Sequence, residues 1–215
     1  MTRISKRLKA ITIFLDKKDS LVDVGCDHAL LSLYLEENDL VDKVIASDIN
    51  QNALNNAIDN IKKRNSNIKT YLSDGIDDVP LKGINTIIIS GMGTRTILHI
   101  LRDNNKLNNI NKIIIQSNND YEILRKEMNN KGYYLEDEEY TYDKNIWYVT
   151  CFFSKRNKKN LSKEIKYGFL TNDDYNEYLI NKERIIFHKI PSSSFFNKIK
   201  AYLKYKRVKR TISSK

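Results

Sequence analysis

Short apolar segments alternate with amphipathic segments through the first 155 residues of this 215-residue chain. Apolar runs of strand length cover 20–24, 43–47, 69–72, 85–90 and 112–116. Amphipathic stretches ending near residue 37 and covering 52–63, 94–101 and 121–130 have the spacing of helices and lie between or after these runs. Strands that alternate with helices favour a parallel sheet with right-handed crossovers. The central runs, Ile87–Ile89 and Ile113–Ile115, are apolar on both faces, which predicts helices on both sides of the sheet.

The last two predicted strands differ from the others because no helix lies between them. They cover 133–139 and 147–154, so we expect them to pair antiparallel and to close the sheet. At the other end of the chain, Ile4, Leu8, Ile11 and Leu15 recur at helical spacing and predict an N-terminal helix.

Beyond Ser154 the strand signal ends and a second region begins. Apolar positions between 161 and 186 predict one long helix with a break near Gly168. Pro191 predicts a turn, Ser192–Ser194 offers N-caps, and a final helix follows whose apolar face carries Phe195, Phe196, Ile199, Tyr202 and Leu203. We therefore predict an α/β fold with two domains, a Rossmann-like sheet domain over 1–155 and a helical hairpin over 156–215.

Charge separates the two regions further. Residues 155–215 contain 17 Lys and Arg against 5 Asp and Glu, whereas the whole chain has a net charge of +10. A body near neutrality with a strongly basic tail is typical of a catalytic domain joined to a polyanion-binding extension. The alternative is that these lysines only solubilise a helical tail.

The turn after the first strand carries the most specific chemistry. Asp23-Val24-Gly25-Cys26-Asp27-His28 runs from a strand through a glycine turn into a helix, the arrangement that brings backbone against a nucleotide-like ligand. Asp27 stands where the second glycine of the dinucleotide motif would be, and its carboxylate would repel a pyrophosphate. S-adenosylmethionine has no phosphate and carries a sulfonium and an ammonium, so the residues favour this donor over NAD.

Polar or glycine residues also follow the later strands. Because the carboxyl ends of parallel strands form the ligand-binding rim of open α/β sheets, we expect them to converge on the donor. An acidic residue after the second strand is suited to accept hydrogen bonds from a ribose, and one after the third strand to meet an adenine edge. The predicted donor-binding residues are Asp23, Gly25, Asp48, Ile49, Asp74, Gly75, Gly91, Met92 and Gly93.

Several of these motifs resemble a known family in order and spacing. D-V-G-C-D-H-A-L-L, A-S-D-I, S-D-G, I-S-G-M-G, I-I-Q-S-N and W-Y-V-T-C-F-F are similar to segments of the bacterial tRNA adenine-22 N1-methyltransferases, and Ser5–Leu8 resembles that family's opening. The resemblance covers about residues 4–154. The chain departs from the family's common residues at Leu30, Ser32, Thr94 and Ser117.

The resemblance implies methyl transfer from S-adenosylmethionine to N1 of an unpaired or flipped adenine in tRNA. Acceptor-side candidates are Asp27, His28, Gln116 and Asn118, which offer hydrogen bonds to a base. Candidates for phosphate contacts, chosen by charge, are Arg3, Lys6, Arg7, Lys198, Lys200, Lys204, Lys206 and Arg207.

Other readings remain open at this point. They are a methyltransferase for another RNA base, a protein or a small molecule, and a non-catalytic RNA-binding protein that keeps a donor fold. The two cysteines, Cys26 and Cys151, form no ligand or disulfide pattern, so we expect no metal and a reducing, cytoplasmic setting. No apolar run approaches membrane-spanning length, and we expect a monomer.

Overall fold

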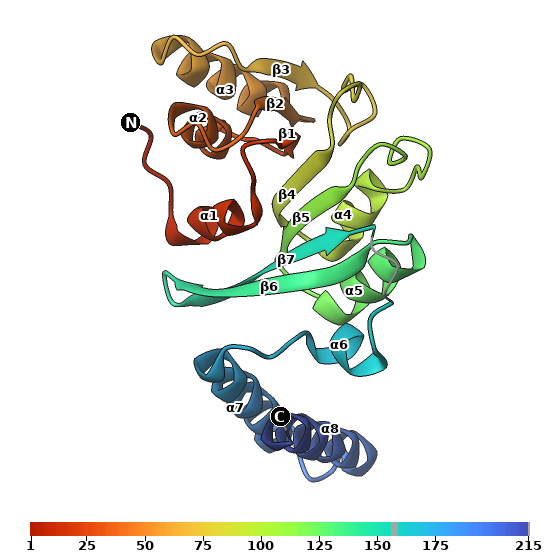
Figure 1. The fold of residues 1–215 in the computed structure, drawn as a ribbon. Helices are drawn as coiled ribbons and strands as arrows, with labels where there is room; N and C mark the ends of the chain where they lie inside the picture. Colours follow the sequence, from red (N-terminus) through yellow and green to blue (C-terminus); the bar gives the residue numbers. More distant parts are fainter. Residues whose placement is uncertain (156–158, 215) are drawn as a thin grey trace. The chain divides into compact units, whose positions relative to one another are not determined.

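A mixed sheet of seven strands organises the part of the chain described by the computed structural model, residues 1–155 and 159–214 (Figure 1). The strand order is β3-β2-β1-β4-β5-β7-β6, and β6 and β7 are antiparallel to their neighbours. The predicted parallel sheet with a closing antiparallel hairpin is therefore confirmed. The strands are β1 (Ser20–Val24), β2 (Lys43–Asp48), β3 (Lys69–Leu72), β4 (Thr86–Met92), β5 (Lys112–Ser117), β6 (Tyr134–Asp143) and β7 (Ile146–Ser154).

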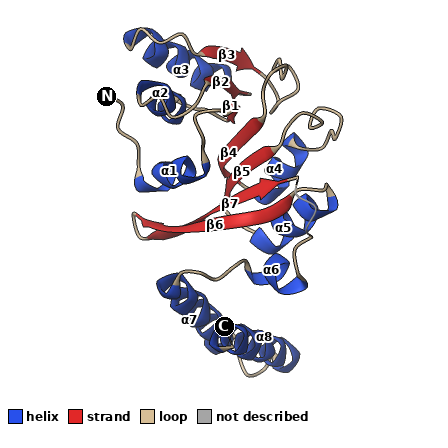
Figure 2. Cartoon of the chain, viewed as in Figure 1, coloured by secondary structure: helices blue, strands red, loops and turns tan. Residues whose placement is uncertain are grey.

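Helices cover both faces of this sheet, as the apolar central strands required. Figure 2 shows α1, α2 and α3 on one side and α4 and α5 on the other. The bounds of the helices in this part of the chain are α1 (Lys6–Ile11), the short 3₁₀ helix η1 (Thr12–Phe14), α2 (Leu30–Glu37), α3 (Gln51–Lys63), α4 (Thr94–Ile100), α5 (Tyr121–Asn130) and α6 (Ser162–Tyr167).

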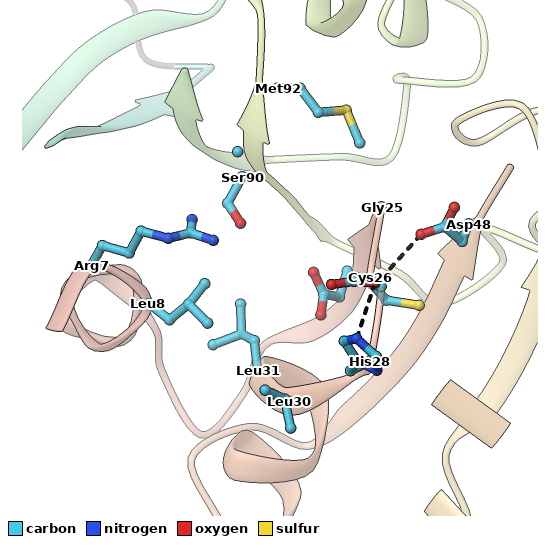
Figure 3. Close-up of a pocket in the computed structure, with 13 residues that line it drawn as sticks. Arg7, Leu8, Gly25, Cys26, His28, Leu30, Leu31, Asp48, Ser90 and Met92 are labelled. Atoms are coloured by element: carbon cyan, nitrogen blue, oxygen red, sulfur yellow. Dashed lines mark hydrogen bonds and ion pairs between the residues drawn. The ribbon is translucent and has the colours of Figure 1, made fainter. Parts of the chain in front are cut away.

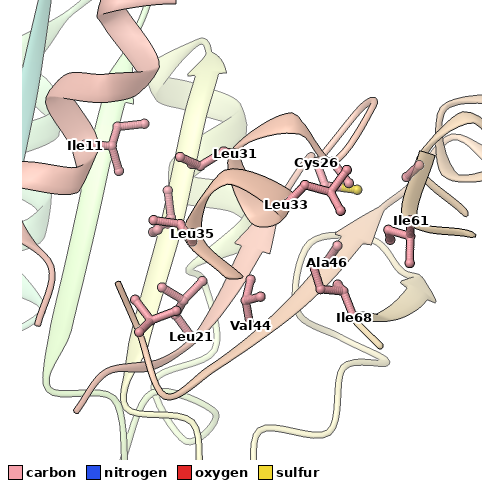
Figure 4. Close-up of a cluster of buried hydrophobic side chains, with 14 of the residues drawn as sticks. Ile11, Leu21, Cys26, Leu31, Leu33, Leu35, Val44, Ala46, Ile61 and Ile68 are labelled. Atoms are coloured by element: carbon pink, nitrogen blue, oxygen red, sulfur yellow. The ribbon is translucent and has the colours of Figure 1, made fainter. Parts of the chain in front are cut away.

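One hydrophobic cluster fixes the first two crossovers against the sheet. Leu31, Leu33 and Leu35 of α2 are almost fully buried and pack in the same cluster as Leu21 of β1 and Ala46 of β2 (Figure 4). Burial of each such leucine stabilises the fold by about 1.5–3 kcal/mol. This packing holds the carboxyl ends of β1 and β2 side by side, which places the loops that follow them at one rim.

The β6–β7 hairpin is longer than the sequence predicted. β6 continues to Asp143, four positions beyond the predicted end at Glu139, and β7 begins at Ile146. Lys144 and Asn145 form the turn with positive φ angles of 48° and 64°, as a two-residue turn between antiparallel strands requires. This tight turn lets the two strands pair as far as Asp143 and Ile146.

Asn160, just before the N-cap of α6 at Leu161, is hydrogen-bonded to the sheet. The Asn160 side chain donates to the backbone carbonyl of Leu135 at 2.9 Å and accepts from its N–H. Gly168 then ends α6 with φ of 75° and lies against the buried Arg125–Glu138 ion pair. The chain accordingly divides into compact units at Gly168, Met1–Gly168 and Phe169–Lys215, rather than at residue 155.

The second unit is a pair of antiparallel helices, α7 (Asp173–Lys189) and α8 (Phe195–Ser213). Phe187 packs on Tyr202, and Lys204 pairs with Glu183 at 2.8 Å. The break that the sequence predicted near Gly168 is present, and it separates α6 from α7.

The prediction for the faces of α8 was wrong. The positions expected to form its apolar face, Phe195, Phe196, Ile199, Tyr202 and Leu203, are all exposed, while Ala201 and Val208 are buried. Tyr202 still contacts Phe187 of α7, so the two helices meet through Ala201, Val208 and the edge of this face. Ser194 is the N-cap by position, although its side chain makes no capping hydrogen bond.

Candidate functional site

The turn after β1 has an unusual backbone. Gly25, Asp27 and Ala29 all have positive φ angles, of 74°, 49° and 54°. The N–H groups of Gly25 and Cys26 donate to the carbonyl of Ser47, and the N–H of Asp27 donates to Asp48. These amides are therefore not free to bind a pyrophosphate, which agrees with the expectation drawn from Asp27.

This turn forms one wall of a cavity at the carboxyl rim of the sheet, with a volume of about 360 Å³ (Figure 3). The cavity lies between the turn after β1, the carboxyl ends of β2 and β4, the start of α2 and the N-terminal helix α1. Its volume falls within the range of small-molecule sites. The lining residues are Arg7, Leu8, Asp23, Gly25, Cys26, Asp27, His28, Leu30, Leu31, Asp48, Ser90, Gly91 and Met92.

Asp48 is held in place by backbone donors. Its Oδ2 accepts from the N–H of Asp27 at 3.0 Å, and its Oδ1 accepts from the N–H of Asn50 at 2.9 Å. The carboxylate thus joins the loops after β1 and β2. Each oxygen keeps a second lone pair that can accept a hydrogen bond from a ligand.

Asp23 lies at the floor of the cavity and is only 4% exposed. The pKa of its carboxyl is raised from 3.8 to about 6. Burial is the largest cause; the hydrogen bond from Ser32 acts in the opposite direction, and the nearby Asp48 carboxylate adds to the rise. The Ser32 hydroxyl donates to Asp23 at 2.7 Å. Ser32, one of the departures from the resembled family, therefore stabilises the ionised form of a cavity carboxylate.

Cys26 lines the same cavity as a neutral thiol. Burial raises the pKa of the thiol, and the Asp23 and Asp48 carboxylates raise it further. Nucleophilic chemistry requires the thiolate, so this cysteine is a packing residue.

Arg7 enters the cavity from α1, although sequence reasoning assigned it to RNA by its charge alone. Its Nη1 donates to Oε1 of Gln116 at 3.1 Å, and its guanidinium lies 5.7 Å from the ring centre of Tyr148. The Gln116 amide also donates to the carbonyl of Arg7 and to Thr150. Figure 3 shows Arg7 extended from its helix toward Ser90.

Two of the four acceptor-side candidates line the cavity. These are Asp27 and His28, which are exposed and approach each other at 3.7 Å. Gln116 is 1% exposed and its amide is used to hold Arg7. Asn118 lies next to the cavity, where its Nδ2 donates to the carbonyl of Gly91 at 2.8 Å.

The predicted donor-binding residues divide in the same way. Asp23, Gly25, Asp48, Gly91 and Met92 line the cavity. Asp74 lies within 3.3 Å of His99, and Gly75 packs tightly on Ile100. The remaining two, which are also outside the lining, are Ile49, an exposed side chain, and Gly93, the N-cap of α4.

Two departures from the resembled family contact each other beside the cavity. The hydroxyls of Thr94 and Ser117 are 2.9 Å apart and fully buried. Thr94 also donates to the carbonyl of Asn119, whose side chain accepts from the N–H of Thr94. These bonds connect the loop after β4 to the loop after β5.

The residues that sequence reasoning missed fall into two groups. Leu8, Leu30 and Leu31 supply an apolar wall that composition alone cannot distinguish from core. Ser32 could have been found, because a serine within the run Leu30–Leu35 is a polar residue on a face predicted to be buried.

The basic residues proposed for RNA lie in both compact units. Arg3 and Lys6 are exposed at the start of α1, and five lie on α8: Lys198, Lys200, Lys204, Lys206 and Arg207. Lys204 is paired with Glu183, and Lys206 lies 5.5 Å from the ring centre of Tyr202.

Neither a metal-binding cluster nor a membrane-spanning helix occurs among the described residues, 1–155 and 159–214. Within them, no group of three or more His, Cys, Asp or Glu side chains is placed to hold a metal ion. None of the described helices has the length and apolar character needed to cross a bilayer.

Comparison with known proteins gives consistent matches. The model of a methyltransferase domain matches residues 4–150. A Mycoplasma genitalium protein whose name assigns it provisionally to the tRNA methyltransferases is 32% identical over 66% of this chain and 66% of its own. The tRNA (adenine(22)-N(1))-methyltransferase of Bacillus subtilis is 30% identical over 63% of this chain, and the alignment spans 58% of that protein.

Among solved structures, the TrmK protein of Mycoplasma capricolum in complex with S-adenosyl-homocysteine superposes over nearly the whole chain. Its TM-score is 0.84 at 27% identity, with 98% of each chain covered. A Streptococcus pneumoniae structure in complex with S-adenosyl-L-methionine has a TM-score of 0.85 at 23% identity, covering 98% of this chain and 100% of that one. At that identity the likeness is one of fold.

Proposed function

Because the chain belongs to the methyltransferase-domain family, we propose that it transfers a methyl group from S-adenosylmethionine to N1 of adenine 22 in tRNA. The substrate is the one named for the Bacillus subtilis relative. The donor is the one named for the Streptococcus pneumoniae structure, and its product is named for the Mycoplasma capricolum structure.

One observation carries this proposal: the tips of β1, β2 and β4 converge on a cavity with three carboxylates and one arginine. Asp23, Asp27 and Asp48 face this space together with Arg7. S-adenosylmethionine presents two cationic groups, a ribose diol and one carboxylate. The charge pattern of the cavity is therefore complementary to the donor.

Each of these side chains has a separate role in holding the donor. Asp48, whose two oxygens keep free lone pairs, accepts hydrogen bonds from the ribose hydroxyls. Asp23 and Asp27 face the cationic groups. Among the described residues that line the cavity, Arg7 is the one arginine or lysine, and it binds the donor's carboxylate.

Methyl transfer to N1 of adenine needs little acid–base chemistry from the protein. The donor supplies an activated methyl group on a sulfonium centre, and N1 has a lone pair in the plane of the base. The chain's contribution is to orient the base and exclude water. Asp27 and His28 are exposed at the cavity wall and Asn118 is exposed next to it, so the carboxylate of Asp27 or the amide oxygen of Asn118 accepts from the exocyclic amine.

Access to N1 sets a requirement on the RNA. N1 lies on the Watson–Crick edge, so the adenine must be unpaired or turned out, at a cost of a few kcal/mol. Basic side chains of α1 and α8 contact phosphates of the tRNA, and these contacts offset the cost of exposing the base. The basic residues of α8 thereby become a tRNA-binding extension.

The test is nucleoside mass spectrometry on unmodified transcripts of one tRNA incubated with protein and S-adenosylmethionine. We expect 1-methyladenosine in the transcript with adenine at position 22 and none in a matched transcript with guanine there. Methylation of both transcripts at equal rates would assign another base. Binding of the donor by calorimetry without methylation of either RNA would overturn the proposed reaction.

A further inference from the structure

The β6–β7 hairpin extends past the rim of the sheet on which the cavity opens. Gln116, next to the last residue of β5, pairs with Thr150 of β7. The part of β7 from Ile146 to Val149 therefore continues beyond its neighbour β5 and pairs only with β6. We call the paired segments 140–143 and 146–149, with their turn, the hairpin tip.

One face of the tip is fixed to the cavity wall. Tyr148 lies under the guanidinium of Arg7, a lining residue, and Asp143 accepts from the backbone N–H of Arg7 at 3.3 Å. Helix α1 packs against β6 and β7. The tip is thus continuous with the side of the cavity that Arg7 occupies.

The other face of the tip presents an aromatic pair. Tyr142 and Trp147 are directly opposite each other in the hairpin, and their ring centres are 5.2 Å apart. Tyr142 is 51% exposed, and Trp147 beside it is half-buried. The exposed ring of Tyr142, packed against Trp147, offers aromatic surface for contact with a ligand.

The geometry of the tip is defined by its backbone. The two-residue turn at Lys144 and Asn145 has positive φ at both positions, which matches the twist of the strands. Cross-strand pairing fixes where the two rings stand. The pair needs little further ordering when it binds a ligand.

We propose that Tyr142 and Trp147 form a stacking platform for an unstacked base of the substrate RNA next to the methylated adenine. Unpaired bases in RNA are recognised by stacking on aromatic side chains. Lys144 at the turn, with Arg3 and Lys6 beside α1, supplies positive charge for the adjoining phosphates. The inference rests on the proposed function, since it assigns a neighbour of the same RNA target.

Fluorescence tests the platform directly, because Trp147 is the single tryptophan in the sequence. We expect saturable quenching of Trp147 when unmodified tRNA is added to the full-length protein. Inorganic polyphosphate, which has charge but no bases, is expected to leave the emission unchanged. Binding of tRNA measured by filter retention, with no change in tryptophan emission, would overturn the platform.

Kinetics with two substitutions provide a second readout. Trp147→Leu removes the aromatic face and is expected to raise the KM for tRNA about tenfold, in the range measured for loss of one base–aromatic stack. Trp147→Phe keeps a ring and is expected to stay within about twofold of the parent. Affinity for S-adenosylmethionine, measured by calorimetry, should be the same in both variants.

These measurements separate the two hypotheses. Methylation at adenine 22 together with equal KM values for Trp147→Leu and the parent would contradict the platform and leave the proposed reaction intact. Absence of both tRNA binding and methylation would contradict both.

Discussion

At the residue scale, the site depends on side chains whose own hydrogen bonds fix their positions. Asp48 is held by two backbone donors, Arg7 by Gln116, and Asp23 by Ser32. A ligand that meets such groups causes little reorganisation of the protein, so more of the interaction energy appears as affinity.

Asp23 predicts a pH dependence. Because burial raises the pKa of its carboxyl to about 6, the folded protein binds this proton more tightly than the unfolded chain does. The contribution of Asp23 to the free energy of unfolding therefore falls as pH rises from about 4 to about 6. By linkage, the loss is on the order of 3 kcal/mol.

A cationic donor next to Asp23 is expected to favour the ionised carboxylate and so to lower the pKa of Asp23. Binding then releases a proton, and affinity for S-adenosylmethionine rises between pH 5 and pH 7, about tenfold for each unit by which the pKa falls. Calorimetry in buffers of different protonation enthalpy measures this release. The Asp23→Asn variant should bind S-adenosylmethionine without releasing a proton. If the variant still releases a proton, that proton comes from another group.

Arg7 gives a second prediction at this scale. Arg7→Met is expected to weaken binding of S-adenosylmethionine about tenfold, since it removes a charged hydrogen bond to the donor's carboxylate. Affinity for decarboxylated S-adenosylmethionine should be unchanged. Lys6→Met, an exposed neighbour on α1 outside the cavity, is the matched control. Equal losses for both donors would make Arg7 a residue that only holds Gln116 and Tyr148.

At the scale of elements, the loops that follow β1, β2, β4 and β5 are connected to one another at the rim. Backbone donors join the first two loops, and the Thr94–Ser117 hydroxyl pair joins the last two. Helix α1, which precedes β1, completes the cavity with Arg7 and Leu8. The rim therefore behaves as a set of coupled loops rather than as independent turns.

The end of α6 provides a prediction about stability. A Cβ on Gly168 would lie 2.0 Å from Oε2 of Glu138 and 2.7 Å from Nη2 of Arg125, which form a buried ion pair. Gly132 has a similar φ of 81° but open space around it. Gly132→Ala is expected to cost about 1 kcal/mol through backbone strain alone.

Gly168→Ala should then cost about 1–3 kcal/mol more, because the added methyl group meets a packed site. Urea unfolding of the two variants and the parent measures the difference. If both variants lose the same free energy of unfolding, the Arg125–Glu138 pair accommodates the added methyl group without destabilising the fold.

At the scale of the whole molecule, the chain combines a near-neutral sheet unit with a basic helical unit. The unit Phe169–Lys215 carries a net charge of +7, from 11 basic and 4 acidic residues, whereas Met1–Gly168 carries +3. Each contact between a basic side chain and a phosphate releases counterions. The loss of one contact therefore reduces the steepness of log affinity against log salt concentration by about 1. The function of the second unit can be tested without removing it.

Replacing Lys198, Lys200, Lys206 and Arg207 with glutamine is expected to weaken tRNA binding and to reduce the salt slope by about 3–4. Lys204 is left in place because it pairs with Glu183. The control replaces four exposed lysines of the sheet unit outside the cavity, Lys18, Lys43, Lys62 and Lys63. If both sets reduce the slope equally, binding follows total charge and α8 is no dedicated RNA surface.

The sequence by itself determined the class and order of the sheet elements. The continuous apolar runs of β4 and β5 favour a sheet covered on both faces, and the ends of its parallel strands bring Gly25, Asp48 and Gly91 to one rim. Those predictions required only local patterns and the rule that parallel strands share a carboxyl edge.

Only the tertiary structure decided which of the polar residues face the cavity. The sequence alone does not show which of the polar residues Gln116 and Arg7 faces the cavity. Packing of α1 on the sheet buries the amide of Gln116 and directs the guanidinium of Arg7 into the cavity. The Tyr142–Trp147 pair exists only because the hairpin pairs to its tip. The direction of the Arg7 side chain depends on its contact with Gln116, which is 109 positions away in the sequence, and no local pattern encodes that contact.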